Sequence, residues 1–156
     1  MSYVNSDGLE ILTAGEAGTA AKRGTVVSPK KALVMTITGT DVPSSVDTPQ
    51  DHDAFIPAGS YITGASLIVT TAFTSGGSAT LTVGTYQQDG TVVDADGIDA
   101  TVALAALAAN KAVACDGAAV SGTATVGAND VYVEAIYGTA AFTAGEAKLV
   151  IEYIEP

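Results

Sequence analysis

Short segments in which apolar and polar residues alternate, separated by turns that contain Gly, Pro or Asp, make up most of this sequence. The clearest two are residues 130–138 and 146–154. In the first, Val131, Val133 and Ala135 alternate with larger or charged residues. Period-two alternation places successive side chains on opposite faces of a β-strand. Seven or eight such strands at hairpin spacing predict an all-β fold, an antiparallel β-sandwich of Greek-key or jelly-roll type.

Turn residues predict how the strands are connected. Gly and Asp signals indicate bends at three places along the chain: 74–77, 87–90 and 94–99. The first bend predicts a β-hairpin between its flanking strands, and the strands at 130–138 and 146–154 predict a second hairpin. Residues 101–110 are rich in Ala and place Leu104 and Leu107 three apart, which predicts a short helix or an irregular segment.

The first 31 residues differ from the rest of the chain. Neither the helical nor the strand period persists there, and Gly15, Gly18, Gly24 and Pro29 interrupt any element that starts. We therefore divide the chain into an extended N-terminal arm, residues 1–31, and a β-sandwich domain, residues 32–156. The arm offers three apolar and four basic side chains to a partner: Leu9, Ile11, Leu12, Lys22, Arg23, Lys30 and Lys31. For the basic four, a solvated stretch is the alternative interpretation.

The formal net charge of -11 argues against nucleic acid as a partner, because phosphate binding relies on clustered Lys and Arg. Residues 32–156 hold fourteen acidic residues against two Lys. An acidic domain of this kind keeps copies of the protein apart in solution or presents a negative face to a basic partner. Because no apolar run has the length of a membrane span and the first residues lack a secretory pattern, we expect no membrane association. Cys115 is the single cysteine, so no intrachain disulfide can form.

One short sequence motif occurs twice in the chain. Ala-Phe-Thr occurs at 72–74 and again at 141–143, each time followed by Gly two residues later. Both copies are expected where a strand ends, a loop turns and the next strand begins. Phe73 and Phe142 are predicted to face inward and close the end of the sandwich, while Gly supplies a loop conformation that other residues resist. The alternative interpretation is that the two loops contact a partner.

Patterns that indicate catalysis or metal binding are scarce. The single histidine, His52, lies between two Asp, but no Gly-x-Ser-x-Gly elbow accompanies it, so a solvated loop histidine is the simpler interpretation. The segment Asp-Ala-Asp-Gly-Ile-Asp at 94–99 offers oxygen ligands for calcium, yet it lacks the Gly and the acid that EF-hand spacing requires. We therefore predict a protein that is not an enzyme, with no catalytic residues, no cofactor and no resident metal.

Three segments of the chain, taken together, resemble one family. They are AFIPAGSYITGASLIVTTAFTSGG at 54–77, DGIDATVALAAL at 96–107 and GTAAFTAGEAKLVIEYIEP at 138–156. Together they resemble small virion structural proteins of tailed bacteriophages, in which an Ile-Pro-Ala-Gly-like turn leads into a strand ending in Thr-Ala-Phe-Thr. The resemblance covers residues 54–156 and leaves the arm out.

The resemblance implies a capsid decoration, or cement, protein. Such a protein is a β-sandwich, often trimeric, that is made in the host cytoplasm and seated on the outer face of an icosahedral head. Its implied partners are the major capsid protein and other copies of itself, with a trimer favoured. The arm would then tie neighbouring capsid subunits together through many weak contacts.

Two other functions remain open at this stage. One is a tail- or fibre-associated protein that contacts a host receptor through a loop such as residues 41–54. The other is a calcium-dependent carbohydrate-binding module that uses the Asp-rich loops, although aromatic platforms for a sugar are scarce in this chain.

Overall fold

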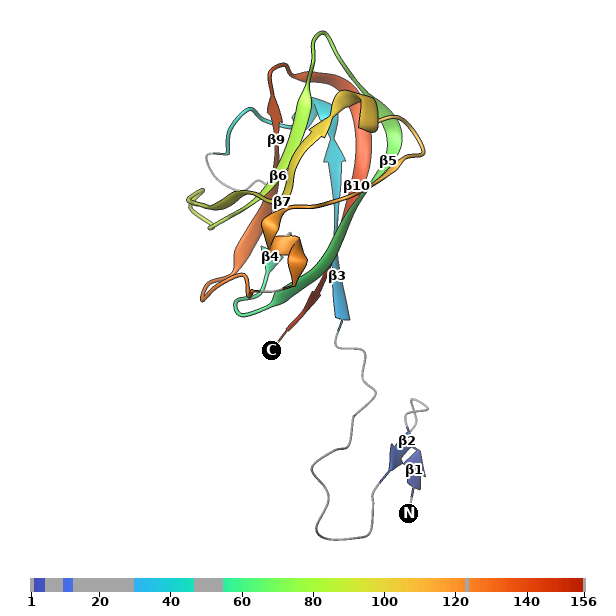
Figure 1. Cartoon of the computed structure of the whole chain (residues 1–156), viewed down its shortest axis with the longest axis vertical. Helices are drawn as coiled ribbons and strands as arrows, with labels where there is room; N and C mark the ends of the chain where they lie inside the picture. Colours follow the sequence, from blue (N-terminus) through green and yellow to red (C-terminus); the bar gives the residue numbers. More distant parts are fainter. Residues whose placement is uncertain (1, 5–9, 13–29, 47–54, 123, 156) are drawn as a thin grey trace.

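The computed structural model describes residues 2–4, 10–12, 30–46, 55–122 and 124–155 (Figure 1). The ten strands in these segments are β1 (Ser2–Val4), β2 (Glu10–Leu12), β3 (Lys30–Thr38), β4 (Phe55–Ile56), β5 (Tyr61–Ser75), β6 (Thr80–Tyr86), β7 (Val92–Ala103), β8 (Ala112–Ala114), β9 (Val131–Gly138) and β10 (Phe142–Ile154). Three short 3-10 turns accompany them: η2 (Gly39–Asp41), η3 (Leu104–Ala106) and η4 (Ala118–Ser121). No helix in the described segments is long and apolar enough to cross a membrane.

Eight of the strands form two four-stranded antiparallel sheets, which confirms the predicted antiparallel β-sandwich. We call them the β10 sheet, with strand order β3-β10-β5-β8, and the β9 sheet, with strand order β4-β9-β6-β7. The pairing is nested along the chain: β3 pairs with β10, β4 with β9, β5 with β8, and β6 with β7. Because Lys30 lies opposite Ile154, the chain enters and leaves the domain at the same end (Figure 1).

The core lies between the sheets and is built from the inward-facing set of each alternating strand. Its largest fully buried side chains are Ile56, Ile62, Leu67, Leu81, Ile98, Leu107, Leu149, Ile151, Val69, Val83, Val131 and Val133. Each side chain of this size contributes about 1.5–3 kcal/mol when fully buried. The predicted alternation at 130–138 and 146–154 therefore identified the buried face of both strands correctly.

Both predicted hairpins are wrong. The strands are present, but β5 belongs to the β10 sheet and β6 to the β9 sheet, and the same division separates β10 from β9. Each connection therefore crosses from one sheet to the other. The physical reason is that alternation shows only that each strand has one buried face. Two consecutive strands both have such a face whether they pair in one sheet or lie in opposite sheets of the sandwich.

The other predicted bends differ in outcome. Residues 87–90 do turn, with the Gly90 amide donating to the Gln87 carbonyl at 2.9 Å. At 94–99 the prediction of a turn is wrong, since β7 runs through this segment. The register jumps there from Asp99 opposite Val83 to Asp94 opposite Thr85, so β7 carries a bulge. The expected short helix at 101–110 corresponds to η3.

The predicted arm is only partly described. Strands β1 and β2 pair with each other as a separate two-stranded sheet. Ile11 and Leu12 belong to β2, whereas Leu9, Lys22 and Arg23 lie outside the described residues. Lys30 and Lys31 are the first residues of β3. The division of the chain into arm and domain stays a prediction.

Candidate partner-binding surfaces

The two copies of Ala-Phe-Thr meet each other in space. Phe73 near the end of β5 and Phe142 at the start of β10 lie on adjacent antiparallel strands. Their ring centroids are 5.1 Å apart with the planes at 76°, an edge-to-face contact, and both side chains are buried. The hydroxyl groups of Thr74 and Thr143 are hydrogen-bonded at 2.8 Å on the solvent side. The prediction that both Phe face inward is confirmed.

The loop expected after Thr143 is absent, because this segment lies inside β10. Gly145 has φ of 130° at a register irregularity of that strand, and a Cβ there would lie 2.4 Å from Cγ of Phe73. The glycine of the second copy therefore lets β10 pass close to the Phe73 ring. Only the first copy is followed by an exposed loop, at residues 76–78.

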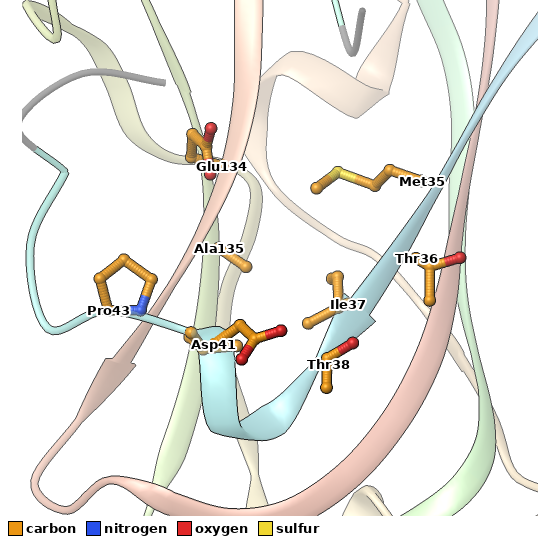
Figure 2. Close-up of a pocket in the computed structure, with 9 residues that line it drawn as sticks. Met35, Thr36, Ile37, Thr38, Asp41, Pro43, Glu134 and Ala135 are labelled. Carbon is orange, nitrogen blue, oxygen red and sulfur yellow. The ribbon is translucent and has the colours of Figure 1, made fainter. Parts of the chain in front are cut away.

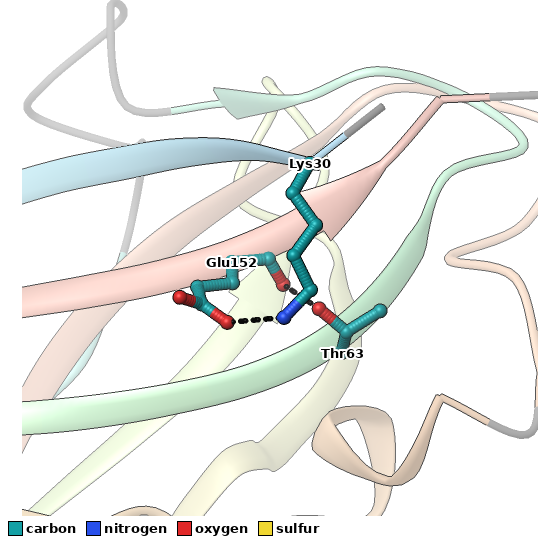
Figure 3. Close-up of polar contacts among 3 residues, drawn as sticks. All are labelled: Lys30, Thr63 and Glu152. Carbon is teal, nitrogen blue, oxygen red and sulfur yellow. Dashed lines mark hydrogen bonds and ion pairs between the residues drawn. The ribbon is translucent and has the colours of Figure 1, made fainter. Parts of the chain in front are cut away.

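Lys30 and Lys31, the two described basic candidates, pair with acidic side chains of their own domain. Lys30 Nζ donates to Glu152 Oε2 at 2.7 Å, beside the bond from the Thr63 hydroxyl to the Glu152 carbonyl at 3.3 Å (Figure 3). Lys31 Nζ donates to Glu155 Oε2 at 2.5 Å, and this hydrogen bond raises the pKa of Lys31. Exposed pairs of this kind stabilise little. Their effect is to fasten the start of β3 to the end of β10.

A groove of about 140 Å³ opens between the end of β3 and the middle of β9 (Figure 2). Met35 and Ile37 line one side, and Pro43 and Glu134 line the other. The groove exists because β4 pairs only with the first two residues of β9. It is smaller than the 300–1,000 Å³ of typical small-molecule sites. Its size suits one protruding side chain of a partner.

The described basic residues gather at one of the two sheets. The four described lysines lie on or beside the β10 sheet: Lys30, Lys31, Lys111 and Lys148. The strands of the β9 sheet contain no Lys or Arg and carry Asp94, Asp96, Asp99 and Glu134. The described lysines are therefore confined to one sheet, whereas acidic residues occur on both: Glu146 and Glu152 lie on β10, and Asp99 and Glu134 of the β9 sheet are buried. Sequence reasoning placed an acidic body after residue 31 but did not find this division, because it assigned no strand to a sheet.

The proposed calcium ligands are not arranged around a common point. Asp99 is buried, and its pKa is raised by that burial and then by Asp116. Burial also raises the pKa of Asp94, whose carboxylate accepts from the Asp96 amide at 3.4 Å. Within the described segments, no group of three or more His, Cys, Asp or Glu is placed to hold a metal ion. His52 and its flanking Asp lie outside those segments.

Cys115 lies beside Asp99 and is buried. Burial, with the nearby Asp99 charge, raises the thiol pKa to about 12, so the thiol stays protonated and unreactive at pH 8. We predict that a disulfide reagent labels no thiol in the native protein at pH 8 and one thiol per chain in denaturant, measured by absorbance. Rapid labelling of the native protein would contradict this burial.

The fold of this chain, rather than its sequence, matches known proteins. No protein-family model matches the chain, and no curated protein matches it in sequence. A chain from the capsid of Ralstonia phage GP4 matches in structure with 16% identity and a TM-score of 0.57, over 86% of this chain and 90% of that chain. A chain from the capsid asymmetric unit of cyanophage Pam1 matches with 16% identity and a TM-score of 0.59, over 93% and 98%. The shared feature is the fold.

An apolar patch lies on the solvent side of the β10 sheet. The outer face of the β10 sheet carries Val34 and Ile68, which are 56% and 43% exposed. Sequence reasoning missed this face, although a signal exists: in 33–35 and 67–69 three apolar residues follow one another, so that both faces of the strand are apolar.

Proposed function

We propose that this protein is a virion structural protein, specifically a decoration or cement protein that binds the outer face of a phage head. The observation that carries the proposal is the near full-length fold match to a phage capsid chain, over 93% of this chain and 98% of the other. A second match, to a capsid chain of another phage, supports it. The phrases at 54–77, 96–107 and 138–156 resemble the same class of protein. The proposal implies that the protein is not an enzyme.

The strand order supports a jelly-roll classification. Nested pairing of eight strands in two four-stranded sheets is the arrangement of double-sheet jelly rolls, which occur in viral capsid domains. Jelly rolls also occur in lectins. The origin of the two matched chains favours the capsid role.

The proposed mechanism is bridging. The domain would sit on one major capsid subunit, and the arm would extend across its neighbours. The pairing of β3 with β10 supports this mechanism, because it holds Lys30 opposite Ile154 and so fixes the point at which the arm leaves the domain. The 29 residues before Lys30 span at most roughly 100 Å when extended, so the arm is long enough to reach a neighbouring subunit. Many weak contacts would then act together. The proposed assembly is a homo-oligomer, with a trimer favoured.

Deleting residues 1–29 tests the mechanism. We expect the truncated protein to fold, because β3 and its ion pairs remain, but to lose its protection of heads against heat and osmotic shock. The measurement compares survival of heads that lack this protein after addition of full-length or truncated chain, with binding followed by co-sedimentation. The melting temperature of the truncated chain is the folding control.

Two outcomes would contradict parts of this proposal. Truncated protein that protects heads as well as the full chain would remove the bridging role of the arm. Full-length protein that does not sediment with heads at any concentration would remove the decoration function itself. Copy number gives an independent check, since a decoration protein is present in many copies per virion and a fibre protein in few.

A further inference from the structure

The outer face of the β10 sheet is unusually apolar for a sheet face turned to solvent. Antiparallel sheets with one solvated face normally carry polar residues there. Five outward positions at the centre of the sheet are small or apolar, with at least one on each strand: Val34 on β3, Val150 on β10, Ile68 on β5, and Ala112 and Ala114 on β8. Thr36, Ser66 and Lys148 are the polar residues in the same rows. The register places Val34 directly opposite Val150, and Ile68 opposite Ala112. We call these five residues the apolar face.

One cation lies in the middle of the apolar face. Lys148 is opposite Thr36 on one side and Ile68 on the other, and its side chain is exposed. No ion pair joins Lys148 to a carboxylate in the part of the chain that the structure describes, in contrast to Lys30 and Lys31. A partner that covers this face must therefore offer a negative group close to apolar side chains.

The edge strand β7 offers that combination. Val92 and Val93 are 56% and 43% exposed, and Asp94 and Asp96 follow them directly. Val93 and Asp94 also line a groove of about 270 Å³. β7 is the outermost strand of the β9 sheet, and Gly117 covers part of its edge, where the Gly117 amide donates to the Ile98 carbonyl at 3.0 Å. The side chains of Val92, Val93 and Asp96 stay exposed to a partner. We call residues 92–96 the acidic edge.

We propose that the apolar face binds the acidic edge of a second copy of this chain. The two surfaces are complementary in both respects that matter here: each has exposed branched apolar side chains, and one carries a lysine where the other carries carboxylates. Two identical surfaces do not pair as well. A contact between two acidic edges would bring carboxylates together without a cation. In a contact between two apolar faces, Lys148 would meet only Glu146 and Glu152, whose carboxylates already accept from Thr70 and Lys30. A contact between two different surfaces is heterologous. It forms a closed ring when the rotation that relates neighbouring copies divides a full turn, and an open filament otherwise.

This inference deepens the homo-oligomer part of the proposed function and rests on it. With a net charge of -11, copies of the chain repel each other. The proposed contact directs Lys148 of one copy toward Asp94 and Asp96 of the next, so that local attraction opposes the overall repulsion. Association should therefore depend on Lys148 and on Asp96, an exposed residue with no role in the core.

The test measures the mass of the purified protein in solution by light scattering across a dilution series. We expect the wild-type chain to form a closed oligomer, and Lys148→Glu and Asp96→Lys each to raise its dissociation constant at least tenfold. The double variant restores an opposite-charge pair at every contact and should recover most of the lost association. The controls are Ser44→Glu/Ser45→Glu and Asp41→Lys, which change the net charge by the same amounts at exposed positions outside both surfaces.

Three results would overturn the proposal. One is a wild-type chain that is monomeric at all concentrations. Another is a Lys148→Glu variant that keeps the wild-type mass, including the case in which it loses head binding, since the apolar face would then contact the head. The last is loss of association in both single variants without recovery in the double variant, when melting temperatures show that all are folded. Failure of the proposed function has a different signature: a normal oligomer that binds no heads.

Discussion

Replacing Phe73 with Ala is expected to lower the free energy of unfolding by about 3–5 kcal/mol, the range for deletion of a buried Phe side chain. Phe73 is 5% exposed and packs against Phe142 and against the close approach of Gly145. The core around it contains no Trp and is built largely from Val, Leu, Ile and Ala. Few neighbours are therefore large enough to fill the space that the ring leaves.

The same truncation at Phe142 should cost a similar amount, and the two losses should not add. Because the rings touch edge to face at 5.1 Å, the double variant is expected to lose about 0.5–1.5 kcal/mol less than the sum of the single losses. Urea denaturation followed by circular dichroism gives the three free energies. Phe55, at 37% exposed, is the matched control, and Phe55→Ala should cost less than either core variant. If the two losses of free energy added exactly, the Phe73 and Phe142 rings would stabilise the domain independently of each other.

Period-two alternation was sufficient to predict the fold class and the buried faces. In β10, for example, Ala147, Leu149 and Ile151 are buried as the pattern indicates. The assignment of strands to sheets was not predictable, because the turn at 74–77 has the same local chemistry whether the next strand pairs alongside or crosses the sandwich. Non-local pairing of β5 with β10 decides between these possibilities.

The bulge in β7 is a second feature that could not be predicted from the sequence. Asp-Ala-Asp-Gly-Ile-Asp at 94–99 has the residues of a turn, yet it lies in a strand whose register shifts beside Gly84. Local turn preference is weak compared with the pairing of a whole strand, so tertiary context changes a turn into a bulge. The same bulge turns Asp99 into the core, where a calcium ligand would not be expected.

The candidate surfaces could be predicted only in part. Lys30 and Lys31 were predicted to be arm residues that contact a partner, and the acidic side chains with which they pair, Glu152 and Glu155, belong to the same chain. That pairing joins the two ends of the domain, more than 120 positions apart in sequence, and no local pattern reports it. The apolar face depends in the same way on register between strands, which puts Val34 beside Val150.

Gly145→Ala is expected to destabilise the domain by about 3 kcal/mol or more, through two separate effects. A residue with a side chain at φ of 130° is strained, at a typical cost of about 1–3 kcal/mol. The added Cβ would also lie 2.4 Å from Cγ and 2.7 Å from Cα of Phe73, and forcing such contacts costs about 1–3 kcal/mol. For a domain of this size, the melting temperature should fall by roughly 6–12 °C.

Two other glycines separate these effects. Gly127 has φ of 110° with no atom within 4 Å of its Cβ position, so Gly127→Ala tests backbone strain without a clash. Gly76 has an equally open Cβ position without a positive φ, so Gly76→Ala should change stability by less than about 0.5 kcal/mol. Calorimetry should show the largest loss of stability for Gly145→Ala, a smaller loss for Gly127→Ala and the smallest for Gly76→Ala. If Gly145→Ala were no worse than Gly127→Ala, β10 could move away from Phe73 without cost, and the second copy of the repeated phrase would not require glycine for close packing.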